Sequence, residues 1–134
     1  MSVDFYPTIR EIFLPPQSQY SFCKGVQAAH VGMGLTVDIA RENGYEGEII
    51  GLHGVVHNKR VTDYHTARGV RFVDTLDGIE KKPVILSAHG TSPQVKATLA
   101  DRNCLEVDLV CPLVTHTHWG ARDAREHGQT VLYF

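Results

Sequence analysis

A segment with helical patterning that ends at a glycine and leads into an apolar segment recurs three times along this chain. The three glycines are Gly44, Gly69 and Gly128. Glycine readily adopts the left-handed conformation that ends a helix. Strands that alternate with helices favour a parallel sheet with right-handed crossovers and helices packed against it. The sequence therefore predicts an α/β fold, a parallel sheet with flanking helices.

Short β-branched segments and helix-start signals define the expected elements. Ser92 followed by Pro93 is a strong helix start, because serine caps the first turn and proline suits the first helical position. The expected strands are Glu11–Leu14, Glu48–Leu52, Val70–Val73, Pro83–Ser87, Val107–Val110 and Thr130–Phe134. The other expected helices are Gly25–Asn43, Lys59–Arg68 and one from Pro112 to about His127. We treat residues 1–134 as a single α/β region, and its apolar last segment leads us to expect that it is a fragment of a longer chain.

Composition excludes several classes of function. The formal net charge is -2 with the 8 histidines counted as neutral, so a nucleic-acid partner is not expected. No apolar run approaches the roughly 20 residues that a membrane helix needs, so no membrane partner is expected either. The 3 cysteines are an odd and widely spaced set, which does not indicate a disulfide framework. We expect a reducing location, cytoplasmic or, in a plant-type source, plastid.

Two cysteines and two histidines each follow an expected strand. They are Cys23, His57, His89 and Cys111. Ligands of open α/β sheets bind beyond the carboxyl ends of the strands. We call this edge, with the loops that follow the strands, the rim, and we expect the four side chains to converge there.

Each of these residues also has an ordinary interpretation. Free cysteine is among the most buried residue types, and loop histidines are commonly just solvated. Cys104 enters an expected strand and is interpreted as structural, whereas His116 and His118 lie two apart on a helix and point to different faces. Thiolates bind iron–sulfur clusters, and histidines beside helix starts bind phosphate oxygens. A zinc site on mixed ligands is the competing hypothesis, although the spacing does not match short zinc knuckles.

Four short motifs occur in order along the chain. They are Phe22-Cys23-Lys24-Gly25-Val26, Val56-His57-Asn58, Ser87-Ala88-His89-Gly90 and Asp108-Leu109-Val110-Cys111-Pro112-Leu113-Val114-Thr115. With this order and spacing, the chain from Leu14 to Phe134 resembles the amino-terminal portion of the IspH/LytB family of 4-hydroxy-3-methylbut-2-enyl diphosphate reductases.

The resemblance implies a cofactor, a substrate and a reaction. Cys23 and Cys111 would be ligands of a 4Fe-4S cluster, and His57 and His89 would contact the diphosphate of the substrate. The family removes the allylic hydroxyl of 4-hydroxy-3-methylbut-2-enyl diphosphate to give isopentenyl and dimethylallyl diphosphate. Electrons would come from a reduced ferredoxin or flavodoxin-type donor. The chain would form one unit, and part of a second, of the family's three-unit fold.

The chain also departs from the family pattern. The family's third cluster ligand and its proton-relay glutamate would lie past Phe134, so no catalytic residue is expected within this chain. Leu109 and Val110 stand where the family usually has alanine and threonine, which changes the polar groups near the cluster. Two alternatives therefore stay open: an inactive module that binds phosphate or metal, and an interaction protein derived from the family.

Overall fold

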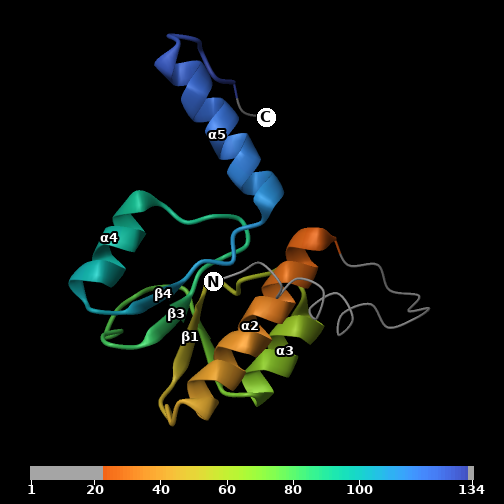
Figure 1. Ribbon diagram of the computed structural model, residues 1–134, viewed down its shortest axis with the longest axis vertical. Helices are drawn as coiled ribbons and strands as arrows, with labels where there is room; N and C mark the ends of the chain where they lie inside the picture. Colours follow the sequence, from red (N-terminus) through yellow and green to blue (C-terminus); the bar gives the residue numbers. More distant parts are fainter. Residues whose placement is uncertain (1–22, 133–134) are drawn as a thin grey trace.

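The computed structural model of the chain describes residues 23–132. Its described part contains a four-stranded sheet in which every pairing is parallel, with the strand order β2-β1-β3-β4 (Figure 1). The strands are β1 (Ile49–Leu52), β2 (Val70–Val73), β3 (Pro83–Ile85) and β4 (Leu105–Val107). The helices are α2 (Lys24–Glu42), α3 (Lys59–Ala67), α4 (Pro93–Asp101) and α5 (Pro112–Glu126). The predicted parallel sheet with flanking helices is confirmed.

The core forms two layers, one on each face of the sheet. Side chains of a strand alternate between its two faces, and β1 follows this rule: Ile49 packs against α2, whereas Ile50 and Leu52 face α4. On the first face, Ala29, Met33 and Val37 of α2 meet Val61 of α3 and Ile85 of β3. On the second face, Leu99 of α4 packs on Val84 and Leu86. Helices on both faces leave the carboxyl ends of the strands open for the rim.

The helix starts and stops follow the sequence signals. The Ser92 side chain accepts a hydrogen bond from the Val95 N–H, and the Asn58 side chain accepts one from the Val61 N–H. Gly44 and Gly69 adopt φ of +78° and +96° directly after α2 and α3, as predicted for helix-ending glycines.

Three expected strands differ from the described structure by more than one residue. β3 covers Pro83–Ile85, so the expected strand Pro83–Ser87 is two residues too long. β4 covers Leu105–Val107 rather than Val107–Val110, because its register is set by β3: Pro83 pairs with Leu105 and Ile85 with Val107, after which β3 ends. The expected strand at Thr130–Phe134 is wrong for residues 130–132, which form no strand. The expected strand at Glu11–Leu14 lies outside the described residues.

Helix α5 extends away from the sheet, as Figure 1 shows in blue. None of its residues is buried, and Leu113 and Trp119 are exposed. Its first turn is nevertheless anchored, because the Cys111 N–H donates to the Ala88 carbonyl at 2.9 Å. Within residues 23–132, no helix is both long and apolar enough to cross a membrane.

Candidate functional site

The side chains of Cys23 and Cys111 both lie close to Gly25. Both are the N-cap residues of helices, Cys23 of α2 and Cys111 of α5. A Cβ atom on Gly25 would lie 3.0 Å from the Cys111 sulfur and 3.9 Å from the Cys23 sulfur. The missing side chain of Gly25 therefore allows both sulfurs to approach the same small space. Both thiols are free.

The imidazole rings of His57 and His89 lie next to each other, on two different loops. Their ring centroids are 4.8 Å apart, with an angle of 35° between the planes. His89 is oriented by Ser87, whose Oγ accepts a hydrogen bond from the His89 N–H at 3.1 Å and lies 3.0 Å from His89 Nδ1. Because Nδ1 faces Ser87, the Nε2 side of the His89 ring is left for another partner. Each imidazole has a ring nitrogen that can donate a hydrogen bond to an anion.

Main-chain hydrogen bonds connect the loops that carry these side chains. The Ala88 N–H donates to the Val55 carbonyl at 3.0 Å, and the Cys111 N–H donates to the Ala88 carbonyl at 2.9 Å. Ala88 therefore links the loop of His57 to the start of α5. The structure brings the four predicted site residues to neighbouring loops on one edge of the sheet, with the cysteines around Gly25 and the histidines around Ser87.

The backbone after β1 is strained. His53 and Val55 have positive φ of 56° and 47°, and the glycine between them has φ of +67°. Positive φ is rare for a β-branched residue such as Val55. Strain of this kind gathers at functional sites, where the surrounding structure holds it in place. It lies in the segment that leads to His57.

The Thr91 hydroxyl is a further polar group in the loop of His89. Its Oγ1 atom is buried and has no hydrogen-bond partner within residues 23–132. A buried hydroxyl without a partner is costly, about 1–3 kcal/mol, so such a group calls for an explanation. A bound polar ligand would provide one.

The rim places two candidate metal ligands, the thiols of Cys23 and Cys111, near one another. Two free thiols that face one space suit thiolate ligation of an iron–sulfur cluster. Among residues 23–132, however, no group of three or more His, Cys, Asp or Glu side chains is arranged to hold a metal ion. The described residues therefore fit a cluster as two of its ligands and not as a complete set. Cys104 takes no part, because it is half-buried and packs against the core on the α4 side.

A second histidine pair lies between α2 and α3, and the sequence patterns did not reveal it. His30 Nδ1 lies 2.8 Å from Nε2 of His65, and His65 is 0% exposed. The ring of Tyr64 meets both imidazoles edge-on. Burial, with the charges of His30 and Arg68, lowers the pKa of His65 to about 4. Burial and Arg68 also lower the pKa of His30. The pair is a packing element rather than part of the rim.

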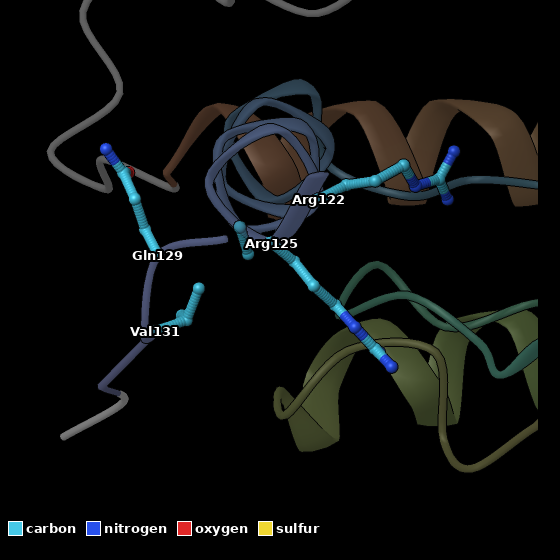
Figure 2. A pocket seen from close by; sticks show the side chains of 5 residues that line it. Arg122, Arg125, Gln129 and Val131 are labelled. Carbon is cyan, nitrogen blue, oxygen red and sulfur yellow. The ribbon is translucent and has the colours of Figure 1, made fainter. Parts of the chain in front are cut away.

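Figure 2 shows a hollow at the far end of α5, lined by Ala121, Arg122, Arg125, Gln129 and Val131. Cys111 lies at the opposite end of this helix. At 1.5 Å per residue the two ends are about 20 Å apart. This hollow is therefore separate from the rim.

Comparisons with known proteins identify relatives that align with nearly the whole of this chain. A family model described as "LytB protein" matches residues 16–134. The 4-hydroxy-3-methylbut-2-enyl diphosphate reductase of Cutibacterium acnes is 37% identical over 98% of this chain, and that of Mycobacterium ulcerans is 38% identical over 98%. The alignments cover 39% and 38% of those relatives, so the chain spans about two fifths of their length.

Two solved structures share the fold. The E-1-hydroxy-2-methyl-but-2-enyl-4-diphosphate reductase from Plasmodium falciparum superimposes with a TM-score of 0.72 at 27% identity, over 82% of this chain and 33% of that one. A structure of (E)-4-hydroxy-3-methyl-but-2-enyl diphosphate reductase gives a TM-score of 0.65 at 22% identity, over 81% of this chain and 37% of that one. This chain thus matches about a third of each neighbour.

Proposed function

Because this chain belongs to the LytB family, whose model matches residues 16–134, we propose that it carries part of the active site of an iron–sulfur diphosphate reductase. The substrate is 4-hydroxy-3-methylbut-2-enyl diphosphate, which loses its allylic hydroxyl to give isopentenyl and dimethylallyl diphosphate. The observation that carries the proposal is the pair of free thiols close to Gly25, together with two imidazoles whose ring centroids are 4.8 Å apart on two hydrogen-bonded loops.

The two cysteines take the role of cofactor ligands in this proposal. Cys23 and Cys111 would hold a 4Fe-4S cluster, together with ligands from outside residues 23–132. When bound, such a cluster supplies electrons and a Lewis-acidic iron to the substrate. The electrons come from a ferredoxin or flavodoxin-type donor. The protein acts in the cytoplasm or, in a plant-type source, in a plastid.

The two histidines take the role of diphosphate ligands. His57 and His89 donate N–H groups to phosphate oxygens, and Ser87 holds His89 in the orientation that makes this possible. The Thr91 hydroxyl, which has no partner among the described residues, gives a further donor in the same loop. These groups bind the diphosphate and thereby orient the substrate.

A second candidate function is a phosphate-binding module without reductase activity. It is favoured by one observation, the absence of a three-ligand metal group within residues 23–132. Under this alternative the histidine pair binds diphosphate while the two cysteines remain free thiols.

Both functions require the histidine pair to bind diphosphate, which calorimetric titration with inorganic pyrophosphate tests. We expect His57→Ala and His89→Ala each to weaken binding by about ten- to a hundredfold, because a hydrogen bond to a charged group contributes about 1.5–3 kcal/mol. His127→Ala is the matched control, since this exposed histidine lies at the other end of α5. Equal affinities for all three variants and the parent would contradict the assigned role of the pair.

A further inference from the structure

His118 lies on the same face of α5 as Cys111. Residues three, four and seven apart share a helix face, so Cys111, Val114 and His118 form one stripe along the helix that begins at the rim. His116, two residues earlier, points elsewhere. The stripe faces the loop of His89, because both Val114 and His118 lie against Gly90 of that loop.

The His118 ring lies against Gly90, the residue after His89. A Cβ atom on Gly90 would lie only 2.9 Å from His118 Cε1, and 3.7 Å from methyl carbons of Val110 and Val114. Gly90 also has a backbone φ of +92°, a value that residues other than glycine rarely adopt. Two features therefore favour glycine at this position. They are the backbone conformation and the close approach of the His118 ring.

The loop is held on two sides. On one side, Ser87 accepts the His89 N–H, and its carbonyl accepts the Gly90 N–H at 3.0 Å. On the other side, the His118 ring covers Gly90. A short loop fixed on both sides would present the His89 imidazole in one orientation, which would lower the entropy lost when an anion binds.

We infer that His118 is a positioning residue for His89: its ring, packed on Gly90, fixes the orientation in which the His89 imidazole faces His57. The consequence for diphosphate binding rests on the proposed function, whereas the orientation of His89 does not. His118 acts through the loop and is not assigned a contact with substrate.

The test compares three variants of the same helix in the ligand-free protein. The ring nitrogen signals of His89 are recorded by long-range proton–nitrogen NMR at constant pH for His118→Ala, His118→Phe and His116→Ala. His118→Ala should move the His89 signals, His118→Phe should return them most of the way because it restores a planar ring, and His116→Ala should leave them in place. Thermal midpoints measured alongside should be as close to the parent for His118→Ala as for His116→Ala.

Three results would overturn the inference. They are unmoved His89 signals in His118→Ala, equal displacement in His116→Ala, and a phenylalanine variant that moves the signals as far as the alanine variant. Titration with inorganic pyrophosphate follows, and His118→Ala should bind more weakly by about tenfold, the loss typical when a group that orients a binding residue is removed. If the parent protein binds no pyrophosphate, the proposed function fails, and the NMR comparison still decides the role of His118.

Discussion

The free energy of unfolding of this protein should fall by about 3 kcal/mol as the pH decreases from about 6.5 to about 4, through the buried histidine His65. His65 is 0% exposed, and burial with the charges of His30 and Arg68 lowers its pKa from 6.5 to about 4. The unfolded chain therefore binds a proton at this position near pH 6.5, whereas the folded chain binds it only near pH 4. The contribution of neutral His65 to the free energy of unfolding is fully present above pH 6.5 and is lost as the pH falls toward 4.

Urea unfolding at a series of pH values checks this result. His65→Leu, which keeps the site filled and removes the titration, should flatten the dependence between pH 6.5 and 4. Some slope should remain from His30, whose pKa is also lowered. Hydrogen bonds and charges from Lys82 and Arg71 lower the pKa of Glu48 to about 2. Glu48 therefore affects stability at lower pH than His65 does. His127→Ala is the control, and an unchanged slope in His65→Leu would contradict the assignment.

Met33→Ala should lower the free energy of unfolding by about 2–5 kcal/mol, the usual cost of truncating a fully buried aliphatic side chain. Met33 is 0% exposed and lies where α2 packs on Ile49, Val70 and Ile85. The loss is a large part of the total, because small domains are stable by only about 5–15 kcal/mol. Since Cys23 caps the same helix, a looser α2 should also loosen the rim.

Ile39→Ala is the matched control for the packing prediction. It removes a side chain of similar size from the same helix, but Ile39 is 53% exposed. Chemical unfolding of the two variants, compared with the parent at one pH, separates burial from helix propensity. A similar loss in both variants would show that α2 does not depend on the packing of Met33.

Local signals in the sequence predicted the elements that local chemistry determines. The Ser92 cap, the proline after it and the glycines after α2 and α3 are all in their expected roles. The sequence patterns failed where contacts with residues distant in the sequence determine the secondary structure. β4 starts two residues earlier than expected because β3 sets its register. Val131 and Leu132 are apolar but have no neighbouring strand in the described sheet.

The placement of the rim residues was also predictable only in part from the sequence. His57 follows β1 and His89 follows β3, as their positions in the sequence predict. The strand expected before Cys23 lies outside the described residues, and Cys111 comes four residues after the end of β4. The close approach around Gly25 depends on where α5 starts relative to α2, which no local pattern encodes. The pairing of His30 with His65 and the contact of His118 with Gly90 join residues 35 and 28 positions apart on different elements, so neither had a sequence signature.

The most direct test of the central claim is iron and sulfide analysis, with an absorption spectrum, of the anaerobically purified protein and of its cysteine variants. We predict a coloured protein that contains iron and sulfide, and loss of both in Cys23→Ser and in Cys111→Ser. Cys104→Ser should retain them, because Cys104 packs in the core on the α4 side. A colourless protein without iron, unchanged by either rim substitution, would contradict the assignment of the two rim cysteines as cluster ligands.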